Sequence, residues 1–289
     1  MEYFDYAAPQ TLNEALSLLA NAGDSGRVLA GGTDLIVMMR GGRRHAKLVV
    51  DGKAIPELQQ LSLNGGLTLG AATSCRRIWE NDAISRAYPA ITDAASIIGG
   101  IAIQGRASIG GNLCNAAPSA DSIPALIALG ATANVASSKG TRQVAVEEFC
   151  TAPGQTVLQP GELLISISIP KQPAKSGAAY IRFTPRNEMD IAVAGVGASV
   201  VLAPDGQTIQ SARIALAAVG PTPIFAKEAG DLLAGKPATD ENLQQAAEAA
   251  RAAARPITDM RGTIDQRKHL VGVLTVRTLK KAIERAKGN

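Results

Sequence analysis

The 289-residue chain is long enough for two domains, and its 19% content of charged residues is that of an ordinary globular protein. Aromatic residues make up only 3% of the chain and the net charge is +4, which disfavours a nucleic-acid binder that stacks bases on aromatic side chains. No apolar run approaches the roughly 18 residues of a membrane-spanning helix.

The three cysteines, Cys75, Cys114 and Cys150, are spread along the chain without a close pair. This number and spacing predict reduced thiols, which cannot hold an iron–sulfur cluster or zinc without ligands from elsewhere. The two histidines also lack further metal ligands at a suitable spacing. Since residues 1–5 do not begin a signal peptide either, we expect a cytoplasmic protein with no metal site of its own.

The first 56 residues alternate between helical and strand patterns. A capping box, Thr11-Leu-Asn-Glu14, begins a helix that ends near residues 21–26. The following elements are then expected: a strand at 27–30, a turn at Gly31-Gly32, a helix at 34–40 and a strand at 47–50. This order predicts a small, mostly parallel sheet.

Residues 57–172 predict a second unit of helices and antiparallel strands. The expected strands lie at 66–71, 132–136, 142–146 and 163–169, and the expected helices at 74–79, 89–98 and 122–129. A polar segment at 171–177 is typical of a linker.

A third α+β unit is expected over residues 177–289. Its strands are predicted at 179–183, 192–202 and 211–219, with a hairpin turn at Pro204-Asp-Gly206, and its helices at 223–233, 240–254 and 274–287.

Two glycine pairs, Gly31-Gly32 and Gly110-Gly111, are candidate ligand loops. Glycine has no Cβ, so the backbone comes close to a ligand there, and backbone N–H groups at such turns bind phosphate. Two such loops predict a diphosphate held from two sides, although a glycine pair by itself is often an ordinary turn. Because no acid–base machinery accompanies the loops, we expect a bound cofactor to carry the chemistry.

Two common nucleotide-binding motifs are excluded. The segment Gly26 to Thr33 has the outline of a phosphate loop, but Gly32 stands where that motif needs a lysine. No Gly-x-Gly-x-x-Gly follows a predicted strand, so a Rossmann fold is not supported either.

At these loops the sequence resembles the flavin-binding medium subunit of the molybdenum hydroxylases, which include xanthine dehydrogenases and aerobic carbon monoxide dehydrogenase. The matching segments are Ala30-Gly-Gly-Thr-Asp34, Ser108-Ile-Gly-Gly-Asn112, Pro118-Ser-Ala-Asp121, Arg186-Asn-Glu-Met-Asp-Ile-Ala192 and Ala217-Ala-Val-Gly-Pro-Thr-Pro223. The resemblance implies an α+β protein with an FAD-binding fold of the vanillyl-alcohol oxidase (PCMH) type. Two FAD-binding subdomains would span 1–56 and 57–172, followed by a C-terminal α+β domain over 177–289.

The resemblance also implies which residues bind FAD. One side of the pyrophosphate would be wrapped by Arg27, Val28, Leu29, Ala30, Gly31, Gly32, Thr33 and Asp34, and the other side by Ser108, Gly110, Gly111 and Asn112. Asp121 would bond a ribityl or ribose hydroxyl, and Leu164 would pack by the adenine or flavin. Ile191 would lie near the isoalloxazine ring, and Arg182 stands where many relatives carry a lysine.

The function implied by the resemblance is electron transfer within a heteromeric oxidoreductase. A large molybdopterin subunit would hydroxylate the substrate, and a small subunit with [2Fe–2S] clusters would supply electrons to FAD, bound non-covalently here, for delivery to NAD⁺ or another acceptor. Some relatives carry a four-cysteine insertion for a further cluster; its absence implies that FAD is the only cofactor of this chain. Two alternatives stay open: a stand-alone FAD-dependent reductase of the same fold, and a non-catalytic nucleotide-binding regulator.

Overall fold

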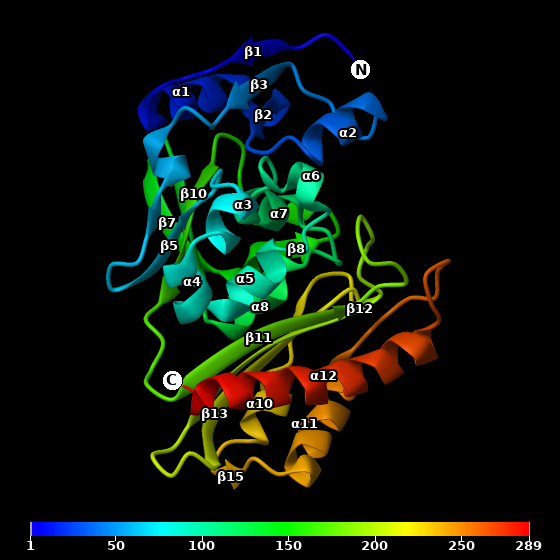
Figure 1. The fold of residues 1–289 in the computed structure, drawn as a ribbon. Coiled ribbons are helices and arrows are strands. Elements are labelled where there is room, and N and C mark those ends of the chain that lie inside the picture. Colours follow the sequence, from blue (N-terminus) through cyan, green and yellow to red (C-terminus); the bar gives the residue numbers. More distant parts are fainter. Residues whose placement is uncertain (1, 289) are drawn as a thin grey trace.

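The computed structural model describes residues 2–288. Three sheets of three, five and five strands follow one another along the chain, and a two-stranded sheet at residues 150–156 accompanies the second. Figure 1 shows the three units from the blue N-terminal part at the top to the orange and red C-terminal part at the bottom. Within the described residues, none of the helices has both the length and the apolar character needed to cross a membrane.

The first unit is a parallel sheet, as predicted, and it has a third strand, at residues 5–7, that was not predicted. Its strand order is β1 (Asp5–Ala7), β3 (Leu48–Asp51) and β2 (Gly26–Leu29). The helix α1 (Leu12–Ala22) begins where the capping box predicted, because the Thr11 hydroxyl accepts a hydrogen bond from the Glu14 N–H. The helix α2 (Leu35–Arg40) follows the first glycine pair, and a short 3₁₀ helix, η1 (Gly23–Ser25), precedes β2.

The second unit is built on an antiparallel sheet, again as predicted, and the strand at residues 61–62 adds a fifth strand to the four that were predicted. Its strand order is β4 (Leu61–Ser62), β5 (Gly66–Gly70), β10 (Leu163–Pro170), β6 (Thr132–Ser137) and β7 (Gly140–Ala145). The remaining elements are η2 (Pro56–Gln59), α3 (Cys75–Trp79), α4 (Asp82–Ala87), α5 (Pro89–Ala95), α6 (Ile101–Gln104), α7 (Ile109–Asn115), α8 (Ser122–Ala128), α9 (Val146–Phe149), β8 (Cys150–Ala152) and β9 (Gln155–Thr156).

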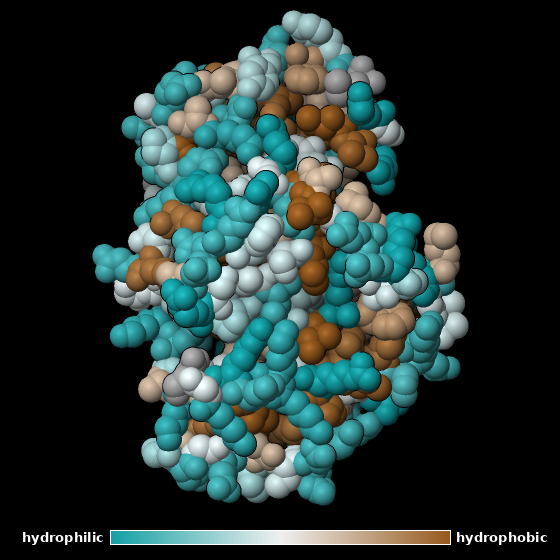
Figure 2. All heavy atoms as spheres, in the orientation of Figure 1, coloured by the Kyte–Doolittle hydropathy of each residue, from teal (hydrophilic) through white to brown (hydrophobic). Residues whose placement is uncertain are grey.

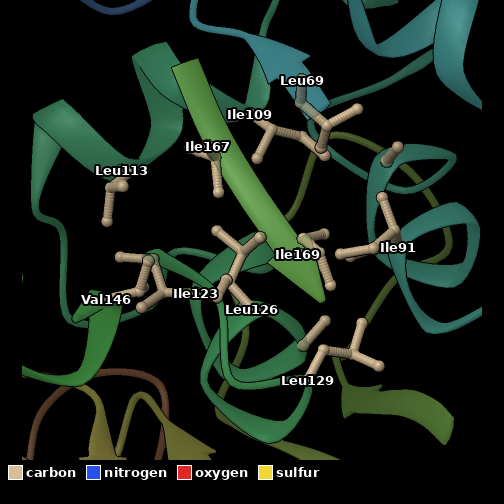
Figure 3. Packing of buried hydrophobic residues seen from close by; sticks show 14 of the residues in the cluster. Leu69, Ile91, Ile109, Leu113, Ile123, Leu126, Leu129, Val146, Ile167 and Ile169 are labelled. Atoms are coloured by element: carbon tan, nitrogen blue, oxygen red, sulfur yellow. The ribbon is translucent and has the colours of Figure 1, made fainter. Parts of the chain in front are cut away.

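The core of the second unit connects β10 with the helices that follow the second glycine pair. Figure 3 shows Ile167 of β10 near Ile109 and Leu113 of α7, with Leu126 of α8 below. These side chains are at most 1% exposed, so they hold α7 firmly against the sheet. The glycines of the second pair belong to the first turn of this helix rather than to a free loop.

The third unit is a second antiparallel sheet, on which two long helices pack. The sheet contains β11 (Ser176–Phe183), β12 (Ala194–Leu202), β13 (Thr208–Ala217), β14 (Ile224–Phe225) and β15 (Lys236–Pro237). The helices are α10 (Lys227–Asp231), α11 (Asp240–Ala253) and α12 (Ile264–Lys287), and α12 lies along the sheet in Figure 1. The predicted hairpin turn at 204–206 joins β12 to β13.

Two helix predictions in this unit were wrong in extent. The helix predicted at 223–233 is reduced to α10, because Ile224 and Phe225 pair with β13 instead. The helix predicted at 274–287 begins at Ile264, where Thr263 caps it. Its first turns did not show an apolar period because the buried position 267 holds an arginine.

An ion-pair cluster fastens the second unit to the third. Asp93 of α5 accepts hydrogen bonds from both terminal nitrogens of Arg285, at 2.6 and 2.9 Å, and from Lys281 at 3.1 Å. It also accepts one from the backbone N–H of Tyr180 in β11. Burial alone would raise the pKa of the Asp93 carboxyl, but these donors together lower it below its ordinary value of 3.8.

We expect Asp93→Asn to lower the free energy of unfolding by about 2–3 kcal/mol at pH 7, since two cations lose a largely buried partner. The native pKa of Asp93 lies below its unfolded value, so this contribution is complete above about pH 4 and disappears as the pH falls further. Urea unfolding at pH 7 and pH 3 measures both effects. The control is Glu57→Gln, because Glu57 is exposed and has no ion pair within residues 2–288. An equal loss at both pH values would contradict the electrostatic explanation.

Candidate functional site

A cavity of about 380 Å³ opens between the first and second units. One wall comes from β2, the first glycine turn and the start of α2. The other comes from the first turns of α7 and the segment 156–164. The cavity therefore lies between the two glycine pairs, which are about eighty residues apart in sequence.

Most of the residues predicted to bind FAD line this cavity. They are Arg27, Val28, Ala30, Gly31, Gly32, Thr33, Asp34, Ser108, Gly110, Gly111, Asn112 and Leu164. Leu29 does not line it, because its side chain is only 8% exposed and packs with Met39 and Val49 in a small hydrophobic cluster. Asp121, Arg182 and Ile191 also lie outside the cavity wall.

The first glycine of each pair allows two backbones to approach. A Cβ on Gly31 would lie 2.4 Å from the carbonyl oxygen of Arg106, and a Cβ on Gly110 would lie 2.4 Å from the carbonyl oxygen of Ala71. Both contacts are with backbone that belongs to the second unit. These two glycines are therefore required by the packing of the cavity walls.

The second glycine of each pair faces different surroundings. Gly32 has a φ of +77°, which favours glycine, and a Cβ there would meet Leu29 at 2.8 Å. A Cβ on Gly111 would meet only the Ser108 hydroxyl, at 2.9 Å, and no other atom within 4 Å. That hydroxyl accepts a hydrogen bond from the Gly111 N–H. Gly111 thus leaves open space in the wall of the cavity, where a bound group can approach the backbone.

Arg27 and Asp34 supply the charges of the cavity. One terminal nitrogen of Arg27 donates to the carbonyls of Asp24 and Gly26, both at 2.7 Å, while its Nε is buried without a partner among residues 2–288. Burial and the neighbouring Arg44 lower the pKa of the Arg27 guanidinium. Asp34 does not cap α2, and desolvation by the surrounding wall raises the pKa of its carboxyl although more than a third of the residue is exposed.

These features fit a dinucleotide that carries a diphosphate and hydroxyl groups. The open wall at Gly111 admits a bulky group, and the free Nε of Arg27 is a donor for an anion. The Asp34 carboxylate makes no capping hydrogen bond with α2, so it is an acceptor for a ligand hydroxyl. No triad or metal site accompanies them: among residues 2–288 no cluster of three or more metal-ligating side chains exists.

Asp121 and Arg182 contact each other instead of the cavity. The Asp121 carboxylate accepts hydrogen bonds from Arg182 at 2.6 Å and from the Tyr180 hydroxyl at 2.8 Å. Burial raises the pKa of the Asp121 carboxyl to about 6, although Arg182 and Tyr180 favour its charged form. This cluster joins α8 of the second unit to β11 of the third. The sequence analysis missed Tyr180, yet its spacing of two from Arg182 on one strand places both on the same face.

Ile191 lies in the loop 184–193 that joins β11 to β12, and it is 46% exposed. The loop rests on the second unit through a hydrogen bond from the Met189 N–H to the Gly99 carbonyl. Gly99 immediately follows Ile98, which lines the cavity. Roles for Ile191, Asp121 and Arg182 in FAD binding stay predictions.

The cavity also contains residues that the sequence analysis did not single out. Among them are Met38, Arg44, Ile98, Cys114 and Leu163. The thiol of Cys114 is a poor nucleophile, because burial raises its pKa to about 12. No local motif marks these residues, since the fold brings them to the cavity from separate segments.

Comparison with known proteins identifies the fold and the family. Residues 2–172 match the family described as "FAD binding domain in molybdopterin dehydrogenase", and residues 179–282 match "CO dehydrogenase flavoprotein C-terminal domain". The chain belongs to the family of FAD-binding subunits of the molybdenum hydroxylases. The resemblance and the α+β fold class predicted from the sequence are thereby confirmed, and so is FAD as the cofactor of this oxidoreductase subunit.

Known relatives and solved structures align with almost the whole length of this flavoprotein subunit. It is 34% identical to the carbon monoxide dehydrogenase medium chain of Afipia carboxidovorans, over 98% of this chain and 96% of the relative. It is 30% identical to the xanthine dehydrogenase FAD-binding subunit of Escherichia coli O157:H7, over 99% and 98%. A structure of CO dehydrogenase from Oligotropha carboxidovorans superposes with a TM-score of 0.93 at 30% identity, covering 98% of this chain and 99% of that one.

Proposed function

We propose that this chain is the electron-transfer subunit of a heteromeric molybdenum hydroxylase. In this assembly a large subunit holds molybdopterin, a small subunit holds [2Fe–2S] clusters, and electrons leave through this chain to NAD⁺ or another acceptor. The observation that carries the proposal is the cavity between the two glycine pairs, with its open wall at Gly111 and the unpartnered Nε of Arg27. Relatives named as single chains of multi-subunit dehydrogenases support it.

Each part of the cavity has a task in this proposal. When bound, FAD accepts two electrons and passes them on. The turn at Gly31-Gly32 holds the diphosphate through backbone N–H groups, and the open wall at Gly111 gives it space. Arg27 neutralises its charge, and Asp34 accepts a hydroxyl of the ligand. Asp121, Tyr180 and Arg182 keep the third unit against the second, so that the loop 184–193 covers the flavin end.

The proposed domains follow one another along the chain. We propose FAD-binding subdomains over 1–56 and 57–172 and a C-terminal domain over 177–289, each of which contains one of the three larger sheets. The free cysteines Cys75, Cys114 and Cys150 support a reducing, cytoplasmic location.

We place the docking face for the [2Fe–2S] subunit where the second unit meets the third. Three large apolar side chains are exposed near this junction: Ile101 is 68% exposed, Met189 55% and Ile191 46%. Figure 2 shows hydrophobic residues along the right-hand side of the middle of the molecule. Exposed apolar residues beside the cavity are typical of a protein interface, and a cluster must come close to the flavin for electron transfer.

Expressed alone, the chain is expected to bind FAD but to show no turnover of purines, aldehydes or N-heterocycles. Acid precipitation should release the FAD, because the raised pKa of the half-buried Cys114 thiol makes it too weakly acidic for a covalent link. Co-expression with the genes beside its own should give a complex that contains molybdenum, iron and FAD. Flavin retained in the acid precipitate would refute non-covalent binding. Hydroxylation by the isolated chain at ordinary enzyme rates would favour the stand-alone reductase.

A further inference from the structure

Two arginines line the cavity beside η1. Arg44 comes from the connection between α2 and β3, and Arg27 from β2; both line the cavity. They are close enough for repulsion by Arg44 to lower the pKa of Arg27. A protein seldom places two guanidinium groups together in a half-buried wall unless an anion binds between them.

Among residues 2–288, no carboxylate forms an ion pair with either arginine. Arg44 is half-buried, yet it forms no hydrogen bond or ion pair with any residue in the described range 2–288. Arg27 uses one terminal nitrogen for two backbone carbonyls and keeps its Nε buried and unpartnered. The carboxylate of Asp24 attracts Arg27 but forms no ion pair with it, and Glu162 of the same cavity is engaged by Arg142 at 2.7 Å.

We propose that Arg44, together with Arg27, forms an anion subsite that binds the diphosphate of FAD on its ADP side. The inference rests on the FAD cavity described above and adds a residue outside the glycine motifs. The diphosphate carries full negative charges, whereas the backbone N–H groups of the glycine turns offer only partial positive charges. A guanidinium adds a full positive charge and directed donors for phosphate oxygens.

Arg44 is the better residue to test. Replacing Arg27 would also free the carbonyls of Asp24 and Gly26, so that a change in folding would accompany a change in binding. Arg44 has no such structural bonds. Its neighbour Arg43 is exposed and does not line the cavity, which makes Arg43→Gln a matched control with the same change in charge.

The experiment titrates the flavin-free full chain with FAD and with ADP by isothermal calorimetry, at low and at high salt. We expect Arg44→Gln to weaken both ligands by about 10- to 100-fold, the size of one lost charge-assisted contact. The same variant should show a smaller loss of affinity with added salt than the wild type, since one counter-charge is missing. Arg44→Lys should recover part of the affinity, and Arg43→Gln should bind both ligands as the wild type does.

Thermal unfolding of each variant without ligand shows whether the fold is kept. Unchanged ADP and FAD affinity in Arg44→Gln would overturn the subsite, and so would a loss with wild-type salt dependence, because the contact would then not be electrostatic. Equal losses in Arg43→Gln and Arg44→Gln would assign the effect to the general charge of the surface. Failure of the wild type itself to bind FAD would instead refute the proposed function.

Discussion

Gly111→Val is expected to abolish FAD binding while the chain stays folded. A Cβ on Gly111 points away from all other atoms except the Ser108 hydroxyl, so two added methyl groups occupy space in the cavity that the diphosphate needs. We expect the affinity for FAD to fall by at least about a hundredfold. Folding should lose no more than about 1–2 kcal/mol: the Ser108 cap is disturbed, whereas valine has a better helix propensity than glycine.

Fluorescence titration with FAD and urea unfolding measure the two effects of Gly111→Val separately. Gly105→Val is the matched control, because Gly105 is exposed, lies outside the cavity and has no atom within 4 Å of an added Cβ. The equivalent change at Gly32 is less informative, since its φ of +77° and its contact with Leu29 would strain the fold. Full flavin content in purified Gly111→Val would rule out this wall as the diphosphate site.

Gly110→Ala, one residue earlier, is expected to destabilise the fold itself by more than about 3 kcal/mol. The added Cβ would lie 2.4 Å from the carbonyl oxygen of Ala71 and 2.5 Å from its Cα. Ala71 cannot move away freely, because its N–H donates to the Ile165 carbonyl at 2.8 Å within the second sheet.

Chemical denaturation followed by circular dichroism gives the stability of Gly110→Ala, with Gly111→Ala as its partner variant. The two substitutions are adjacent and chemically identical, so the difference between them reports only where each Cβ points. Similar stability of both variants would show that α7 shifts to accommodate the new methyl group. In that event Gly110 would have no packing role.

Several features of the fold could be predicted from short segments. The capping box at Thr11 correctly located the start of α1, and the alternating apolar residues at 163–169 predicted β10. The two glycine pairs lie in opposite walls of one cavity, as expected for segments that hold one ligand from two sides. These predictions succeeded because each depends on backbone conformation or on residues two to four positions apart.

Other features depend on residues far apart in sequence. Asp121 and Arg182 were predicted as separate FAD contacts, but they pair with each other across 61 positions. Arg27 and Arg44 face one cavity only because β2 and β3 are neighbours in a parallel sheet. Helix α12 extends over buried Arg267, whose terminal nitrogen bonds the carbonyls of Val193 and Ala218, and no helical period reveals such a position.

The sequence by itself determined the start of α1, the main strands of the sheets and the positions of the two glycine pairs, because local backbone preferences and side-chain periodicity are properties of neighbouring residues. Only the tertiary structure decided which glycine supports packing and which faces the cavity. Gly110 and Gly111 are identical in the sequence, but they differ in their surroundings. Ala71 lies beside Gly110, whereas Gly111 faces open space. The charge and the free volume of a binding site depend on which distant residues the fold brings together.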